Sequence, residues 1–103
     1  MDFGETIHQL SITFPELEKF NLSSQIRRAS DSVALNISEG AIGQSNLEQQ
    51  KFIGYSIRSL AEVITCLHKA NRRNYISEEE FTKRYDEAYH LMNMMIAFRK
   101  NIK

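Results

Sequence analysis

The sequence contains the residue types of a di-iron carboxylate site. In helical bundles, such a site takes a Glu-x-x-His pair from each of two helices and one glutamate from each of two others. The matching residues are Glu5, His8, Glu39, Glu62, Glu87 and His90. At helical spacing, Glu5 and His8 lie more than about 120° from the apolar face of their segment. Glu87 and His90 are similarly displaced from theirs. Ligands that point to solvent cannot converge on an ion, so we expect no metal site.

No side chain is set up as a catalytic nucleophile. Cys66 has no CxxC partner, and His68 falls on a different face of a helix, so the two do not form a nucleophile–base pair. The sequence also has no glycine-rich phosphate loop. We therefore expect a protein that is not an enzyme and needs no cofactor, with its histidines on solvated helix surface.

Cationic side chains gather at one end of the expected fold. The start of the second helical segment and the end of the third meet there, and they carry Arg27, Arg28, Lys69, Arg72 and Arg73. Such a group of cations can hold the phosphates of a nucleic acid. Carboxylates at the same end can pair with these cations instead: Glu16, Glu18, Glu78, Glu79 and Glu80. The sequence leaves both interpretations open.

Polar residues occur near the end of the second helical segment. Asn36 falls on its apolar stripe, with Glu39 beside it. A core-facing amide must find hydrogen-bond partners, and it can also fix register or oligomeric state. We expect Asn36, Glu39 and Gly40 to form a structural polar network. Gly40 and Gly43 bracket the end of the segment, where a glycine can take the left-handed cap conformation.

Four helical segments position these residues. Pro15 ends the first, because the residue before a proline avoids the helical conformation. Ser45 with Glu48, and Ser77 with Glu80, match the Ser-x-x-Glu capping box that begins a helix. The apolar periodicity predicts helices at about 3–14, 22–39, 46–73 and 78–101. Short connections make neighbours antiparallel. We expect a single all-α domain over 1–103, an antiparallel up-down-up-down four-helix bundle with a short first helix.

Apolar residues also occur away from the core-facing stripes: Leu35, Phe52, Val63, Cys66, Met94 and Phe98. A monomer would expose them, and contiguous exposed apolar patches usually mark interfaces. The pattern therefore predicts a self-association surface. The alternative is that a small bundle has wide apolar stripes and exposes some of their edges.

Composition limits the partners and the compartment. The chain has 103 residues with 13 basic and 13 acidic side chains, so it offers no bulk attraction to nucleic acid or to an acidic membrane. Such binding needs local segregation of charge. One cysteine excludes an internal disulfide and suits a reducing compartment. No apolar run approaches the ~20 residues of a membrane span. We expect a cytoplasmic protein that does not enter a membrane.

Several motifs resemble those of a known family. They are Phe14-Pro15, Glu18, Leu22, Ser24-Gln25-Ile26-Arg27-Arg28-Ala29, Ser32, Asn36-Ile37-Ser38-Glu39-Gly40, Phe52 and Ser59-Leu60-Ala61-Glu62. On these motifs, the sequence resembles the four-helix-bundle proteins encoded in intervening sequences of bacterial 23S ribosomal RNA genes. Those proteins are related to the accessory variability determinant proteins of diversity-generating retroelements. The resemblance covers nearly the whole chain.

The resemblance implies ring-like pentamers. The retroelement members have basic surfaces, bind nucleic acid and partner a reverse transcriptase, whereas the intervening-sequence members have no established activity. It makes Arg27 and Arg28 the best nucleic-acid candidates. This chain departs from the family because Asn21 stands where glycine is usual, because its net charge is zero, and because its first helix starts later.

These observations favour a homo-oligomeric binding module, pentameric by resemblance, that engages structured RNA or DNA through a basic rim. The alternative is a homo-oligomeric adaptor that binds another protein and no nucleic acid. Salt-dependent RNA binding separates the two, because phosphate contacts release counterions.

Overall fold

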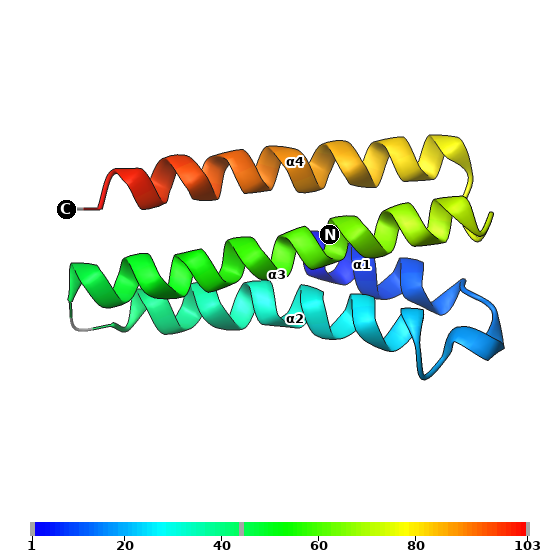
Figure 1. Ribbon diagram of the computed structural model, residues 1–103, viewed down its shortest axis with the longest axis horizontal. Helices are drawn as coiled ribbons and strands as arrows, with labels where there is room; N and C mark the ends of the chain where they lie inside the picture. The colour runs from blue at the N-terminus through cyan, green and yellow to red at the C-terminus, as the bar shows by residue number, and fades with distance from the viewer. Residues whose placement is uncertain (1, 44, 103) are drawn as a thin grey trace.

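Helices make up almost all of the regular structure. The computed structural model describes residues 2–43 and 45–102. Over those residues the chain has no strand and forms α1 (Phe3–Ile12), the short 3₁₀ helix η1 (Glu16–Glu18), α2 (Leu22–Ala41), α3 (Asn46–Arg72) and α4 (Glu78–Lys100). Figure 1 shows the α-helices lying along the long axis of a molecule that measures 43 × 24 × 22 Å. The prediction of an all-α fold with four α-helices is confirmed.

The first helix ends earlier than predicted. It was expected to reach Phe14 and ends at Ile12. Thr13 closes it, because the backbone N–H and the hydroxyl of Thr13 both donate to the carbonyl oxygen of Leu10, at 3.0 and 2.7 Å. Phe14 is buried although it lies outside the helix, with its ring centroid 5.9 Å from that of Tyr75. The predicted ends of the other helices differ from the observed ones by one or two residues.

Neighbouring helices run in opposite directions along their contacts. The hydroxyl of Ser56 in α3 donates to the carbonyl oxygen of Val33 in α2 at 2.7 Å. Ser59 in α3 donates to the hydroxyl of Ser32 in α2 at 2.8 Å. The later residue of α3 is thus bonded to the earlier residue of α2, which is the pattern of two antiparallel helices. Figure 1 shows the same reversal of direction between α1 and α2 and between α3 and α4.

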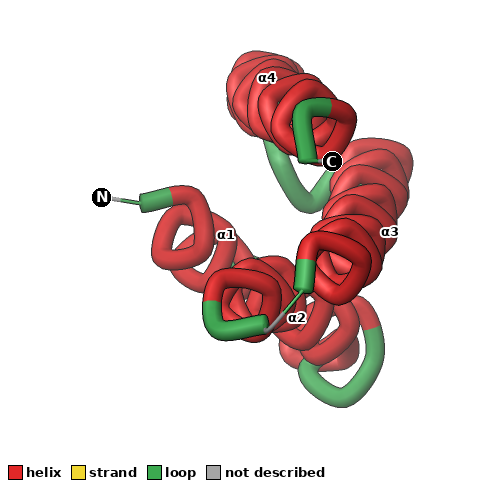
Figure 2. Tube along the Cα trace, turned by 90° about the vertical axis from the view of Figure 1, so that its left-hand side faces the viewer, coloured by secondary structure: helices red, strands yellow, loops and turns green. Residues whose placement is uncertain are grey.

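The helices pack as a row rather than as a closed ring. α1 packs on α2, α2 on α3, and α3 on α4, whereas α1 and α4 do not pack extensively against each other. Figure 2, which looks along the helices, shows that this row is curved into an open arc with α1 and α4 at its two ends. α1 has 10 residues and α4 has 23, so α1 is too short to cover the length of α4. One side of α4 is therefore left without a neighbouring helix.

The core lies where α2 and α3 face each other and their neighbours. α4 contributes only Ala88 and Met95 to the fully buried set, because it packs mainly on α3. None of the helices that the structure describes combines the length and the apolar character needed to cross a membrane. The buried apolar residues are Ile7, Leu10, Phe14, Leu22, Ile26, Ala29, Val33, Ile53, Leu60, Val63, Ile64, Cys66, Leu67, Ala70, Ala88 and Met95.

Two serines begin α3 and α4 as predicted. The side-chain oxygen of Ser45 accepts a hydrogen bond from the N–H of Glu48 at 3.1 Å. The side-chain oxygen of Ser77 accepts one from the N–H of Glu80 at 3.0 Å. Each bond satisfies a backbone amide that has no partner within its helix. The helix starts are therefore fixed by contacts between residues three apart in the sequence.

The predicted left-handed glycine at the end of α2 is wrong. None of the chain's glycines has a positive φ, and Gly40 lies buried inside α2. A Cβ at Gly40 would lie 3.4 Å from the Cβ of Phe52, so α3 lies directly against this glycine. The left-handed residue is Asn74, with φ 61°, just beyond α3. It lets the N–H of Tyr75 donate to the carbonyl oxygen of Ala70 at 2.9 Å, which closes the helix.

Candidate nucleic-acid interface

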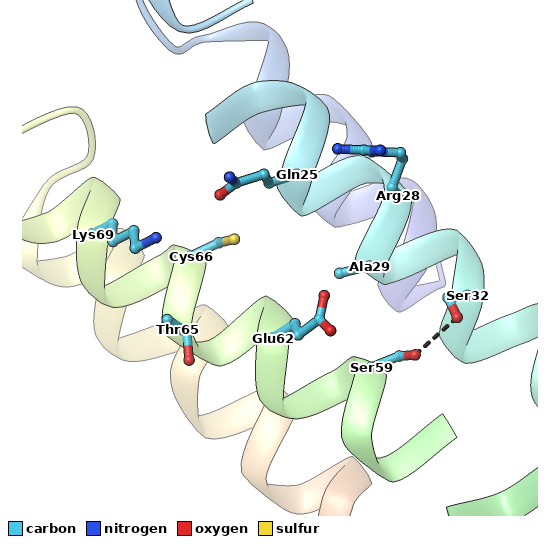
Figure 3. A pocket seen from close by; sticks show the side chains of 9 residues that line it. All are labelled: Gln25, Arg28, Ala29, Ser32, Ser59, Glu62, Thr65, Cys66 and Lys69. Atoms are coloured by element: carbon cyan, nitrogen blue, oxygen red, sulfur yellow. Dashed lines mark hydrogen bonds between the residues drawn. The ribbon is translucent and has the colours of Figure 1, made fainter. Parts of the chain in front are cut away.

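Arg28 and Lys69 line the same hollow between α2 and α3 (Figure 3), with a volume of about 460 Å³. Both side chains are exposed, and neither forms an ion pair within the described part of the chain. Glu62 lines the same hollow, so its carboxylate offsets part of the positive charge. The lining residues are Gln25, Arg28, Ala29, Ser32, Ser59, Glu62, Thr65, Cys66 and Lys69.

Helical spacing brings these side chains together. On α2, Gln25, Arg28 and Ser32 follow one another at intervals of three and four residues, so they share one helix face. On α3, the same intervals align Ser59, Glu62, Cys66 and Lys69. Figure 3 shows the two faces on either side of the hollow, joined at one end by the hydrogen bond from Ser59 to Ser32.

Cys66 contributes no reactive thiolate to this hollow. Burial raises the pKa of its thiol. The charge of Lys69 opposes this shift and the charge of Glu62 adds to it. A thiol with a raised pKa stays protonated at neutral pH and behaves as a small apolar group. Cys66 is therefore part of the wall of the hollow.

Arg73 is held by a buried carboxylate. Its guanidinium lies 3.0 Å from Oε2 of Glu18, whose side chain is 4% exposed. The hydroxyl of Tyr75 donates to the same oxygen at 2.7 Å, and the side-chain amide of Asn21 donates to Oε1 at 3.0 Å. The hydrogen bond from Tyr75 lowers the pKa of Glu18 most, and the N–H of Leu22 and the charge of Arg73 lower it further against the effect of burial. For Arg73, pairing with a carboxylate is the observed arrangement.

The structure does not bring all the predicted cations together. Arg27 lies on the other side of α2, half-buried, where it lines a hollow of about 180 Å³ with Ser11 of α1 and Lys19 of the connection. Arg72 is exposed on α3, three residues beyond Lys69, and forms no ion pair with the described residues. The predicted group therefore divides into Arg28, Lys69 and Arg72 on one side, and Arg27 and Arg73 in separate contacts.

The predicted polar network has different members. The side-chain amide of Asn36 donates to the carbonyl oxygen and the hydroxyl of Ser32, at 2.9 and 3.0 Å. Because Ser59 also donates to Ser32, this network links α2 to α3. Glu39 is exposed, and Gly40 accepts a hydrogen bond at its carbonyl oxygen from the N–H of Gly43 at 3.3 Å, so neither is among the described contacts of Asn36. The serines were missed, although their positions on the α2–α3 faces were readable from helical spacing.

The predicted self-association surface is only partly exposed. Val63 and Cys66 are buried within the chain, so the expectation that a monomer exposes them is wrong. The reason is that α3 packs against both α2 and α4, which buries a wide arc of its surface. Phe52 is half-buried. The side chains that remain exposed are Leu35 at 65%, Met94 at 55% and Phe98 at 50%.

The histidines do not assemble with carboxylates or the cysteine. Among the residues that the structure describes, no group of three or more such side chains is placed to hold a metal ion. His8 and His90 are exposed on their helices. The ring of His68, also exposed, packs against the rings of Phe81 and Tyr85 at centroid distances of 5.2 and 5.3 Å.

Known proteins give a family and a fold. The model of the family described as 23S rRNA-intervening sequence protein matches residues 1–97. A crystal structure of a protein with unknown function from the S23 ribosomal protein family, from Bacteroides thetaiotaomicron VPI-5482, is similar with a TM-score of 0.79 at 20% sequence identity. The similarity covers 97% of this chain and 100% of that one, and at this identity it shows the fold alone. No curated protein matches the sequence. Since the family model covers almost the whole chain, the protein belongs to the 23S rRNA-intervening sequence protein family.

Proposed function

We propose that this protein is a non-enzymatic module that binds structured RNA or another nucleic acid at the hollow between α2 and α3. The observation that carries the proposal is that Arg28 and Lys69 line one hollow and stay exposed without an ion-pair partner among the described residues. Arg72 extends the same cationic side along α3. A chain with zero net charge needs this local segregation to attract phosphates.

The side chains of the hollow suit contacts to a sugar–phosphate backbone. Arg28 can bind a phosphate through two N–H groups at once, and Lys69 supplies a compact charge on a flexible stem. The side-chain amide of Gln25 adds a further donor. Glu62 repels phosphate, so we expect the ligand to lie across the mouth of the hollow. Such contacts position a nucleic acid without reading its bases, so little sequence preference is expected.

The test is binding of a fluorescent RNA hairpin across a salt series, for the wild type and for Arg28→Ala/Lys69→Ala. We expect weaker binding by the variant and a smaller salt dependence, with the slope of log affinity against log salt reduced by about 1.4 to 1.8 for two lost phosphate contacts. Lys19→Ala/Lys83→Ala removes the same charge from residues outside the hollow. This control should keep the wild-type slope.

The outcomes separate a located site from general charge attraction. If both double variants lose slope equally, the nucleic acid does not bind at this hollow. If the wild type binds no hairpin even at low salt, the proposal is wrong and the adaptor becomes the better hypothesis. An adaptor would bind another protein, and the partner that the resemblance suggests is a reverse-transcriptase-like enzyme.

We also propose that the module is homo-oligomeric, and pentameric by resemblance. Met94 and Phe98 support this, since they are half exposed and lie one turn apart on α4, which packs mainly on α3. Leu35 is exposed on α2, which does not pack extensively against α4. An exposed apolar residue on α2 and two on α4 can form a head-to-tail contact between subunits. Such contacts close into a ring when the rotation from one subunit to the next divides a full turn evenly.

Light scattering during size-exclusion chromatography tests the assembly. We expect the wild type to elute as an oligomer at micromolar concentration, and Met94→Glu/Phe98→Glu to elute as smaller species, because buried charge opposes the contact. Asn93→Glu/Ala97→Glu adds the same charges at the same spacing to exposed positions of α4 and should leave the assembly unchanged. A wild-type monomer at that concentration contradicts the proposal.

A further inference from the structure

The solvent-facing side of α3 carries an ordered line of side chains. Its members recur at intervals of three, four or seven residues, so they follow one face of the helix. All are exposed, and they are Lys51, Tyr55, Arg58, Glu62, Lys69 and Arg72. We refer to this line as the outer ridge of α3. Lys69 and Glu62 belong to both the ridge and the hollow described above.

In the first half of the outer ridge, Tyr55 lies between the cations Lys51 and Arg58, and Phe52 lies beside them. The ammonium group of Lys51 lies 5.4 Å from the ring centroid of Phe52 and 6.0 Å from that of Tyr55. The guanidinium carbon of Arg58 lies 5.8 Å from the ring centroid of Tyr55. The two rings meet edge to face at 5.8 Å. We refer to these four residues as the ring–cation cluster. Tyr55 is 39% exposed, so part of its surface is open to a ligand.

A second hollow adjoins the ring–cation cluster on the α4 side. It has a volume of about 450 Å³ and is lined by Lys51, Tyr55 and Arg58 of α3 and by Arg99 of α4. Among the described residues that line it, none is a carboxylate. In contrast to the first hollow, nothing in this lining offsets its positive charge. It is therefore the better place for a phosphate close to an aromatic ring.

Arg99 is held in place at this hollow. Its Nε donates to the carbonyl oxygen of Gln50 at 2.8 Å. A Cβ at Gly54 would lie 3.3 Å from that Nε, so the glycine leaves the space in which the guanidinium lies. The terminal N–H groups of the guanidinium have no hydrogen-bond partner among the described residues, so they can meet a ligand. The hollow thus has one cation in a fixed position beside two on flexible stems.

We propose that the ring–cation cluster is a subsite for single-stranded nucleic acid, in which an unpaired base stacks on Tyr55 and the adjoining phosphates contact Lys51 and Arg58. Arg99 contacts a phosphate from the other wall. This inference rests on the proposed function and adds the class of ligand, an unpaired strand. Aromatic rings beside cations are the combination that binds single strands without sequence preference, because every base has a face that can stack.

The position of the subsite agrees with one ligand contacting both hollows. Tyr55 and Lys69 are 14 residues apart on α3, which corresponds to about 21 Å at 1.5 Å per residue. A stacked strand covers this distance in about six nucleotides at 3.4 Å each. An RNA hairpin with a single-stranded tail can therefore place its paired region near Lys69 and its tail on Tyr55.

The first test measures binding of a single-stranded oligonucleotide by fluorescence anisotropy, as RNA and as DNA. Tyr55→Leu keeps an apolar side chain but removes the ring, and we expect affinity to fall about 5- to 150-fold with the salt slope unchanged. Tyr55→Phe keeps the ring and should bind like the wild type. Lys51→Ala/Arg58→Ala should instead reduce the salt slope by about 1.4. If the variants lose the same affinity for RNA as for DNA, the subsite contacts the base and the phosphate rather than the 2′-hydroxyl.

The second test uses the absence of tryptophan from the sequence. Tyr55→Trp places a single indole in the subsite, and stacking of a base on it should quench its fluorescence on titration with the same oligonucleotide. Tyr89→Trp is the matched control, because Tyr89 is 43% exposed and lies on α4 outside the hollow. Its fluorescence should not change. Circular dichroism of each variant checks that the helices are retained.

The outcomes distinguish this inference from the proposed function. Quenching at Tyr55→Trp together with weakened binding of Tyr55→Leu supports the subsite. Binding of the single strand with neither effect overturns the subsite and leaves the proposed function in place. If the protein binds the hairpin but no single strand, the subsite is likewise overturned and the proposed function stays in place. If neither nucleic acid binds, the proposed function and the subsite are both wrong.

Discussion

Glu18 and Tyr75 make folding stability depend on pH in two ranges. The pKa of Glu18 is lowered below its ordinary value of 4.5, first because Tyr75 donates a hydrogen bond to it. The charged carboxylate therefore contributes stability above about pH 4.5, and this is lost as the pH falls through the lowered pKa. The pKa of Tyr75 is raised above 10.0 by the same bond. Its contribution is present below about pH 10 and is lost as the pH rises through the raised pKa.

We predict that Glu18→Gln lowers the free energy of unfolding at neutral pH and weakens its dependence on pH in the acid range. The amide can still accept from Tyr75, but it carries no charge for Arg73 and does not titrate. Urea unfolding across the acid range measures both effects. Glu16→Gln is the control, because its side chain is 90% exposed and should not affect either quantity. An acid dependence in Glu18→Gln as steep as in the wild type contradicts the prediction.

At the scale of elements, α4 combines limited burial with charged and capped ends. Its first turn carries Glu78, Glu79 and Glu80, and its last turn carries Arg99 and Lys100. The acidic side chains lie at the positive end of the helix dipole and the basic ones at its negative end, so both groups stabilise the helix. Its apolar residues spread widely around the helix, so few of them face α3 fully. The cap at Ser77 is therefore important for keeping α4 in place.

We predict that Ser77→Ala lowers the free energy of unfolding by about 1 kcal/mol, because the N–H of Glu80 loses its acceptor. For a chain of this size, that corresponds to a fall of about 4–8 °C in Tm. Thermal unfolding followed by circular dichroism measures it. Ser77→Asp keeps an acceptor at the same position and should stay close to the wild type. Equal losses in both variants would show that the cap does not hold the helix.

At the scale of the molecule, stability is concentrated in the α2–α3 pair. These two helices supply most of the buried apolar residues and are joined by Ser56 and Ser59 through hydrogen bonds. Among the described residues, α4 packs mainly on α3, and α1 packs mainly on α2. Segments with few buried contacts open locally at lower free energy than the core. The ends of the row should therefore open before its centre.

We predict that backbone amides of α4 exchange with solvent faster than those of α2 and α3. Measuring exchange in Met94→Glu/Phe98→Glu keeps subunit contacts from protecting α4. In that background, Met95→Ala should speed exchange mainly in α4. Leu60→Ala, at a fully buried position of α3, should lower global stability by about 2–5 kcal/mol and speed exchange throughout. Uniform protection across the helices would contradict the predicted order of opening.

Local interactions explain what the sequence by itself determined. The all-α class and the starts of α3 and α4 follow from apolar periodicity and from Ser45 and Ser77 bonding to amides three residues away. The family was also readable from the sequence, on motifs spread along the chain, and it is confirmed over residues 1–97. Periodicity, capping residues and family motifs can all be identified without knowing which helices pack against each other.

The tertiary structure alone decided which side chains are buried, paired or exposed. Val63 and Cys66 are buried because α3 packs against two helices, and helical spacing within α3 does not contain that information. Arg73 is paired with Glu18, which lies 55 residues away along the chain and meets it only in the folded protein. Arg28 forms no ion pair with the described residues. Gly40 lies inside α2, which continues to Ala41, and it is buried against Phe52 and Ile53 of α3. The burial and pairing of these side chains depend on contacts between segments that are distant in the sequence. Packing of the helices sets the geometry of such contacts, and local conformational preference does not.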